Sequence, residues 1–291
     1  MRIPLLLSLA AVLIGGTAFG LENDLPPRDV RLIEKKFEAL ANRDADPIGA
    51  KALAIEPAKW KHAETDHFIL HYRRATEAQK VVREIEFDLW FVARALGAQK
   101  DRYAKKSHVY VFEDEREWLG FIGQVDVPKW TASFAHGDEL FLHVGGMGEG
   151  FDSDILGHET THAVVSRIYP DRHWPRWLNE GFAEYMGTAS QAARKKIWTK
   201  GMQKEIEVIP IPLAELVKMT EYPDNPEQVQ RFYRTSEKVV RFLMNEYPKE
   251  RFHLFAEALM AGTPLETALP QVYAGQVKNY ADFLKQYARS K

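Results

Sequence analysis

Short apolar runs and longer segments of helical periodicity alternate along the first half of the chain. Three runs rich in aromatic and β-branched side chains predict buried strands, and two segments between them carry apolar residues three and four apart, which predicts amphipathic helices. The strands are expected at residues 68–72, 109–112 and 139–144, and the helices at residues 77–96 and 115–122. This strand–helix–strand–helix–strand order predicts a small α/β unit with a mixed sheet.

The flanking segments show helical periodicity alone. Residues 29–43 have apolar residues at helical spacing, and residues 44–57 are expected to form a connector. After Asp152 the pattern is helical, and no internal repeat or Gly/Ser-rich linker interrupts it. We therefore expect an α+β fold with one domain over residues 60–291. The expected divisions are residues 21–59 for an N-terminal helix and connector, 60–150 for an α/β half and 151–291 for a helical half.

The first twenty residues have the layout of a secretory signal peptide. Arg2 supplies the positive charge, residues 5–14 form the apolar core, and residues 18–20 offer small side chains for cleavage before Leu21. We expect removal of residues 1–20 and a periplasmic or secreted mature protein, in a bacterial envelope, without a stable membrane span. An uncleaved N-terminal anchor is the alternative.

Composition excludes several classes of protein. With 45% hydrophobic and 27% charged residues, the chain is an ordinary globular protein. A net charge of −2 removes the electrostatic basis for non-specific nucleic-acid binding, and the densest basic cluster, residues 194–196 with Lys200, is typical of a solvated helix face. The absence of cysteine excludes disulfides, thiolate metal sites and cysteine nucleophiles. Any metal must therefore be bound by His, Asp or Glu.

Candidate chemistry lies in the helical segment that opens the second half. His158 and His162 are four residues apart, which places both on one face of a helix, one turn apart. Two imidazoles at this spacing can bind one Zn²⁺, and Glu159 lies beside them without being in line with them. Glu159 is therefore the candidate general base that activates a zinc-bound water. Two surface histidines on an amphipathic helix are the alternative interpretation.

A catalytic zinc needs a third protein ligand and an open position. Glu180, eighteen positions after His162, lies on the next predicted helix, and the loop between them contains two prolines that can turn the chain back. Glu184 follows one helical turn later and could accept a hydrogen bond from the free ring nitrogen of a ligand histidine. The sequence thus predicts one Zn²⁺ per chain, bound by His158, His162 and Glu180.

The stretch from His158 to Tyr185 resembles the catalytic region of gluzincin zinc metallopeptidases, the His-Glu-x-x-His…Glu group that includes thermolysin and aminopeptidase N. Residues 179–185 (NEGFAEY) are similar to the third-ligand helix of aminopeptidase-like and peptidase MA-like domains, and a weaker likeness covers much of residues 60–291. The resemblance implies a gluzincin fold with its active site in a cleft between the two halves, a peptide or protein substrate, and the same roles for the ligands, the base and Glu184. The spacer between His162 and Glu180 has seventeen residues, where the aminopeptidase branch usually has eighteen, which indicates a divergent branch.

The resemblance also concerns substrate binding. Residues 139–144 are similar to the sheet-edge strand along which gluzincins bind extended peptides. Tyr233 lies in the region where the family has a catalytic tyrosine; we expect it to precede a long helix and to stabilise the oxyanion, with a core tyrosine as the alternative and His173 as the second candidate. Residues 145–149 (GGMGE) resemble the aminopeptidase Gly-x-Met-Glu-Asn signature only loosely and fit a Gly-rich turn better, so exopeptidase specificity is unsupported.

Several other side chains have no spacing that links them to this chemistry. Core or surface roles are expected for His67, His71, His136 and His143, and packing roles for Trp174, Trp177, Phe182 and Tyr185. A catalytically inactive zinc-binding module of the cell envelope, or a hydrolase of another amide such as a cell-wall peptide, would carry the same site residues. The sequence leaves open the substrate, endo- versus exopeptidase action and the oligomeric state.

Overall fold

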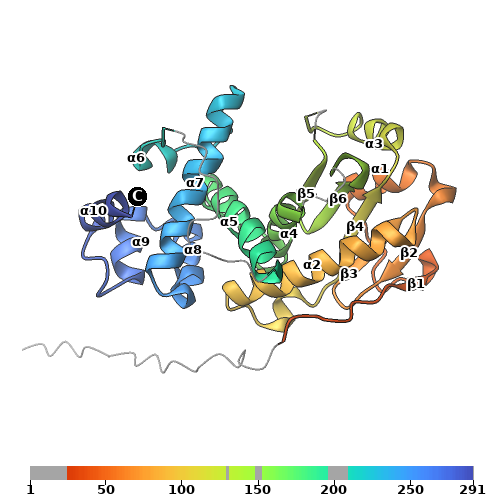
Figure 1. Cartoon of the computed structure of the whole chain (residues 1–291), viewed down its shortest axis with the longest axis horizontal. Coiled ribbons are helices and arrows are strands. Elements are labelled where there is room, and N and C mark those ends of the chain that lie inside the picture. Colours follow the sequence, from red (N-terminus) through yellow and green to blue (C-terminus); the bar gives the residue numbers. More distant parts are fainter. Residues whose placement is uncertain (1–24, 129–130, 148–152, 196–208, 291) are drawn as a thin grey trace, which may run out of the picture.

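The computed structural model describes residues 25–128, 131–147, 153–195 and 209–290. They form two lobes side by side, one built on a β-sheet and the other helical, joined through α4 (Ser153–Ile168) and α5 (Arg176–Lys195) (Figure 1). The predicted signal peptide lies outside the described residues. No helix among the described residues combines the length and the hydrophobicity that a membrane span requires.

The sheet has mixed strand directions, in the order β1-β2-β3-β4-β6-β5. Its strands are β1 (Ile33–Lys35), β2 (Lys61–Glu64), β3 (Phe68–Tyr72), β4 (Ser107–Phe112), β5 (Ser133–His136) and β6 (Glu139–His143). The three strands β3, β4 and β6 run parallel to one another, whereas β1, β2 and β5 pair antiparallel with their neighbours. The α+β class and the mixed sheet predicted from the sequence are confirmed.

Helices connect the strands and make up the second lobe. The remaining α-helices are α1 (Pro47–Ala54), α2 (Ala75–Ala95), α3 (Glu115–Ile122), α6 (Leu213–Leu216), α7 (Pro226–Glu246), α8 (Phe252–Met260), α9 (Leu265–Val272) and α10 (Tyr280–Arg289). The 3-10 turns are η1 (Phe37–Ala39), η2 (Pro57–Lys59), η3 (Lys100–Tyr103), η4 (Val144–Met147) and η5 (Lys249–Arg251). All described elements after Asp152 are helical, as the periodicity predicts.

The two faces of the sheet belong to two separate apolar clusters. Leu70, Val109 and Leu140 point to the face that packs on α2 and α4, in a cluster that continues into the helical lobe. Tyr110 and Phe141 point to the other face and pack with aromatic residues of α3. Successive residues of a strand alternate between these clusters because side chains have a period of two in a strand. Since both faces are covered, the central strands appear in the sequence as unbroken apolar runs.

The N-terminal segment differs from its prediction. Residues 29–43, expected as a helix, contain β1 and η1 instead. Ile33 is 60% exposed, so its apolar side chain does not mark a buried helix face. Strand pairing prevails here because β1 pairs with β2, and Lys35 forms an ion pair with the buried carboxylate of Glu64 at 2.9 Å. Helix propensity and hydrophobic periodicity determine local structure less strongly than such tertiary contacts do.

The predicted connector over residues 44–57 contains a helix, α1. Asp46 caps it by accepting hydrogen bonds from the backbone amides of Ile48 and Gly49, both at 2.7 Å, and Pro47 occupies its first turn. An Asp–Pro pair is a recognised helix start, so the sequence carried a signal for α1. The prediction of a connector was wrong because this helix is short and only partly buried.

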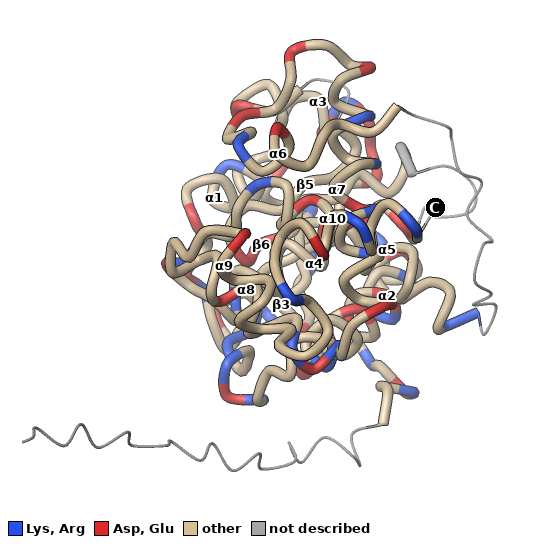
Figure 2. The backbone as a smooth tube through the Cα atoms, turned by 90° about the vertical axis from the view of Figure 1, so that its left-hand side faces the viewer, with Lys and Arg blue, Asp and Glu red and all other residues tan. Residues whose placement is uncertain are grey.

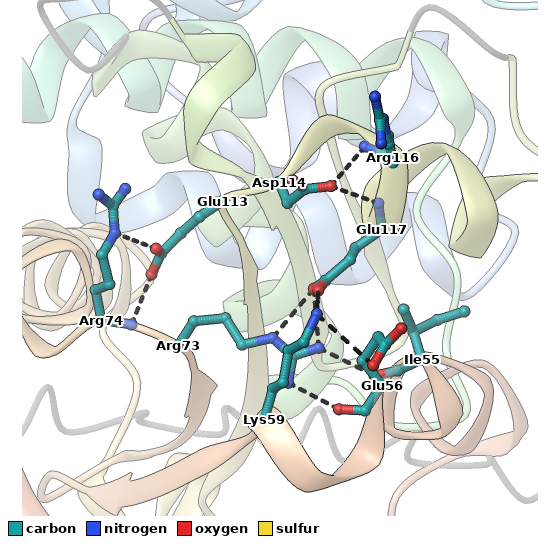
Figure 3. A network of polar contacts seen from close by, with 9 residues as sticks. All are labelled: Ile55, Glu56, Lys59, Arg73, Arg74, Glu113, Asp114, Arg116 and Glu117. Carbon is teal, nitrogen blue, oxygen red and sulfur yellow. Dashed lines mark hydrogen bonds and ion pairs between the residues drawn. The ribbon is translucent and has the colours of Figure 1, made fainter.

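A polar network ties the ends of β3 and β4 to the loop before β2 (Figure 3). Arg73 donates to the carboxylate of Glu117 at 2.9 Å and to the backbone oxygen of Ile55 at 3.0 Å, and its guanidinium lies 3.7 Å from the centre of the Trp60 ring. Lys59 donates to the other oxygen of Glu117 at 2.9 Å. These contacts fix α3 against the sheet. Figure 2 shows acidic and basic residues interspersed along the chain seen from that side, in keeping with the near-zero net charge.

Candidate metal centre

The helices that carry the candidate ligands pack at backbone distance. Gly157 of α4 faces Gly187 of α5, and a Cβ atom at position 157 would lie 2.9 Å from the Gly187 Cα. A Cβ atom at position 187 would lie 2.6 Å from the carbonyl oxygen of Asp154. Only glycine permits so close an approach. Since Gly157 directly precedes His158, this crossing places His158 against α5.

Three ligand atoms converge at this crossing. The Nε2 atoms of His158 and His162 are 3.0 Å apart, and the Oε2 atom of Glu180 is 3.5 Å from the first and 3.4 Å from the second. In the part of the chain that the structure describes, these residues are the one group of three His, Asp or Glu side chains whose ligand atoms all lie within 4.8 Å of one another. The three residues predicted as ligands are therefore brought together.

Their geometry fits a zinc ion. Tetrahedral Zn²⁺ with ligand bonds of about 2.0–2.1 Å places its ligand atoms about 3.3 Å from one another. The observed separations of 3.0, 3.4 and 3.5 Å bracket that value. Two imidazoles with one carboxylate also form a donor set that zinc prefers in catalytic sites, where the fourth position stays open.

The charge distribution favours a cation. Burial raises the pKa of the Glu180 carboxyl, but the adjacent His162 and His158 outweigh burial and hold this pKa well below its ordinary value. Burial lowers the pKa of His158, but hydrogen bonds to Glu180 and Glu184 outweigh it and hold this pKa well above its ordinary value. The cluster thus stabilises positive charge between its carboxylates, as a divalent ion requires.

Glu184 contacts the far side of His158. Its Oε1 atom is 3.1 Å from Nδ1 of His158, and it lies one helical turn beyond Glu180 on α5. The adjacent carboxylate favours a proton on Nδ1, which leaves the lone pair of Nε2 directed at the cluster. Glu184 therefore lies where the sequence predicted a hydrogen-bond acceptor for a ligand histidine.

Glu159 lies beside the cluster and reaches the sheet. Its Oε2 atom accepts a hydrogen bond from the backbone amide of Ala135 on β5 at 2.9 Å. Burial raises the pKa of Glu159, and the charges of His158 and His162 act against this rise. Its carboxylate is outside the group of three converging ligand atoms, as expected for a base and not a ligand.

Two tyrosines border the cluster on the helical side. Tyr233 lies inside α7 and not, as the sequence had predicted, before a helix. Its ring centre is 6.1 Å from that of His158. Tyr222 donates its hydroxyl hydrogen to Oε1 of Glu180 at 2.7 Å. The sequence had not predicted this residue as part of the site. No spacing pattern marks Tyr222, because it lies in a polar loop 42 residues from its partner.

The other sequence candidates lie apart from the cluster. His173 is exposed in the loop between α4 and α5, and among the described residues no hydrogen bond joins it to the three converging side chains. His67 contacts Glu86, and His136 lies 3.6 Å from Asp46. His143 stacks on Trp118 in the core.

The aromatic residues expected to have packing roles are buried within the apolar cluster of the helical lobe: Trp174, Trp177, Phe182 and Tyr185. In the stretch 145–149, Gly145 lies in η4 and residues 148–149 lie outside the described residues.

The edge of the sheet differs from its prediction. The strand predicted at residues 139–144, β6, lies between β4 and β5, so it is not an edge; β5 forms the edge beside α4. The strand β5 has four residues, too few to show an alternating pattern in the sequence. Gly137 and Asp138 form a two-residue hairpin turn between β5 and β6. Gly137 has a φ of 56°, as the first residue of a type II′ turn requires.

Comparison with known proteins adds no assignment to this geometry. No family model, no curated protein and no solved structure matches the chain.

Proposed function

We propose that this chain is a zinc-dependent metallopeptidase of the gluzincin type. The observation that carries the proposal is the convergence of His158 Nε2, His162 Nε2 and Glu180 Oε2, with the carboxylate of Glu159 next to them and hydrogen-bonded to the edge of a sheet. The gluzincin fold, the export predicted from residues 1–20 and the peptide substrate are parts of this proposal.

Zinc at this position would supply Lewis acidity, polarising a carbonyl and lowering the pKa of water. Glu159 accepts the proton of the attacking water and returns it to the leaving amine nitrogen, so that one carboxylate serves as base and then as acid. Glu184 holds the ring of His158 in the tautomer that directs Nε2 to the metal. Tyr233 donates its hydroxyl hydrogen to the oxygen that becomes negative when the peptide carbonyl is attacked.

The free edge of β5 offers a track for the substrate. His143 donates its amide hydrogen to the carbonyl of Ala132, so Ala132, Phe134 and His136 form the hydrogen-bonded pairs with β6. The amide and carbonyl groups of Ser133 and Ala135 consequently point outward. Because Glu159 accepts from the Ala135 amide, an extended peptide paired with this edge would pass directly beside the base.

The test combines metal analysis with a peptide library. Purified wild type should bind one zinc per chain and cleave library peptides. Glu159→Gln should retain zinc and fold while turnover falls by about 10²–10⁴-fold, because an amide cannot accept the proton. His162→Ala should lose stoichiometric zinc. Wild type that contains zinc and cleaves no peptide would favour a binding module, or a hydrolase of another amide if cell-wall peptides are cleaved.

A further inference from the structure

A short loop segment is fixed to the first turns of α5 by one guanidinium. Arg176 donates its Nε hydrogen to the carbonyl oxygen of Thr220 at 2.6 Å, and its Nη2 atom lies 3.8 Å from the carboxylate of Glu221. Its guanidinium carbon also lies 4.2 Å from the centre of the Tyr222 ring. Arg176 thus contacts three consecutive loop residues: a backbone carbonyl through Nε, a carboxylate through Nη2 and an aromatic ring through the guanidinium plane.

Arg176 and Glu180 are four residues apart, so they share one face of α5. Both contact the same loop, because the hydroxyl of Tyr222 donates to Glu180. The ring of Tyr222 is therefore held from one side by Arg176 while its hydroxyl end reaches the buried carboxylate. This arrangement orients the hydroxyl although the Tyr222 side chain is 42% exposed.

The two oxygens of Glu180 have separate partners. Oε1 accepts the Tyr222 hydroxyl at 2.7 Å, whereas Oε2 faces the Nε2 atoms of His158 and His162 at 3.5 and 3.4 Å. A hydrogen bond from a hydroxyl to a carboxylate is charge-assisted and strong. It occupies Oε1 and leaves Oε2 as the oxygen that is directed at the cluster.

We propose that Tyr222 is a positioning residue that restricts Glu180 to coordinating the metal through Oε2 alone, and that Arg176 holds Tyr222 in place. The inference rests on the proposed function only in that the cluster binds a metal. A carboxylate free of this hydrogen bond can bind through both oxygens and take up the position that a catalytic zinc needs open. Tyr222 therefore keeps one coordination position available.

The neighbouring tyrosine, Tyr233, differs from Tyr222 in its contacts. The rings of Tyr222 and Tyr233 stack with centres 6.1 Å apart and planes at 16°. A hydroxyl has one hydrogen, and that of Tyr222 is directed at Glu180, so Tyr222 has none to offer a substrate. Tyr222 thus acts through Glu180, whereas Tyr233 remains the candidate donor to the substrate.

The experiment compares Tyr222→Phe with Tyr233→Phe, since each removes one hydroxyl from a neighbouring ring. Zinc affinity is measured by competition with a chelator, and coordination number is read from the absorption spectrum of the full-length protein loaded with Co²⁺. Tyr222→Phe should weaken zinc binding by about 10–100-fold and move the Co²⁺ spectrum towards higher coordination. Tyr233→Phe should leave both readings as in wild type, and Arg176→Ala should shift them in the same direction as Tyr222→Phe, by less.

The outcomes separate the inference from the proposed function. Unchanged affinity and an unchanged Co²⁺ spectrum in Tyr222→Phe overturn the role of Tyr222, whatever the peptidase activity of the wild type. The expected changes in a protein that cleaves no peptide overturn the peptidase and support the role of Tyr222. A wild type that takes up neither Zn²⁺ nor Co²⁺ overturns both.

Discussion

Gly181 of α5 lies against the backbone of Ser236 on α7, so that a Cβ atom at position 181 would be 2.4 Å from the Ser236 carbonyl oxygen. Gly181 directly follows the candidate ligand Glu180, and Tyr233 lies one helical turn before Ser236. The close contact that sets the distance between α5 and α7 therefore lies next to the candidate metal centre. A change in this distance should move the candidate ligand Glu180 and the candidate oxyanion donor Tyr233 apart.

Gly181→Ala should destabilise the fold and weaken metal binding together. The added methyl group meets backbone on α7 and cannot be relieved by rotating a side chain, and such overpacking typically costs about 1–3 kcal/mol. Urea unfolding and zinc titration of the same preparation measure both effects. Gly120→Ala is the matched control, because nothing lies within 4 Å of a Cβ atom there and the site is in helix α3. The control should gain up to about 1 kcal/mol from helix propensity; equal behaviour of the two variants would refute the packing argument.

The sequence predicted those parts of the molecule whose contacts repeat along the chain. The strand at residues 68–72 was found because all five of its side chains are buried, which leaves an apolar run that only His71 interrupts. The three converging side chains were predicted because His158 and His162 are related by one helical turn and Glu180 lies within a recognisable motif. Tyr222 depends on the path of a loop, and no local pattern records which carboxylate that loop will meet.

Short edge strands were missed for a related reason. β1 and β5 have three and four residues, too few to establish a period of two. Their places in the sheet are fixed by partners, Glu64 for β1 and the hairpin turn at Gly137 for β5. The error at β5 mattered most, because it assigned the free edge to β6, which is an interior strand.

Tyr233→Phe should lower kcat by about 10²–10³-fold if the Tyr233 hydroxyl meets the oxyanion. Its ring packs against the core and remains in the variant, so thermal stability should change little. Steady-state kinetics on a cleaved library peptide, with zinc content measured in parallel, separates a loss of turnover from a loss of metal. A variant with wild-type kcat removes Tyr233 from the mechanism, and His173→Ala then tests the second sequence candidate.

Proline scanning of β5 should distinguish its outer edge from its inner edge. Ala135→Pro removes an outward amide that pairs with Glu159 and not with β6, so the sheet should persist while peptide cleavage falls strongly. His136→Pro removes an amide that pairs inward with Glu139 and should lower stability instead. Circular dichroism melts and peptidase rates of the two variants provide the comparison. Unimpaired cleavage by a folded Ala135→Pro variant would show that the hydrogen bond from the Ala135 amide to Glu159 is not needed for activity.

Three histidines form a hydrogen-bonded row across strands β2, β3 and β4, on the side of the sheet away from α2. Nδ1 of His62 lies 2.8 Å from Nδ1 of His71, and Nε2 of His71 lies 2.9 Å from Nδ1 of His108. Burial lowers the pKa of all three, that of His108 to about 4 from an ordinary 6.5. The charged groups that act on His108 are Asp138, Lys105, Asp44 and Asp46.

Acid should destabilise the protein through this row. The folded-state pKa of His108 lies below its unfolded value, so the unfolded chain binds more protons; the stability contributed is complete above about pH 6.5 and is lost as the pH falls towards 4. Between pH 7 and pH 5, His108 alone should lower the free energy of unfolding by about 2 kcal/mol.

His108→Asn keeps a polar group near the Nδ1 position but cannot titrate. Its free energy of unfolding should therefore fall less over this interval than that of wild type, whatever its absolute stability. His173→Asn, at an exposed position, is the control and should follow wild type. The measurement is urea unfolding at pH 7, 6 and 5, and parallel pH profiles for wild type and His108→Asn would show that His108 is not kept neutral by the fold.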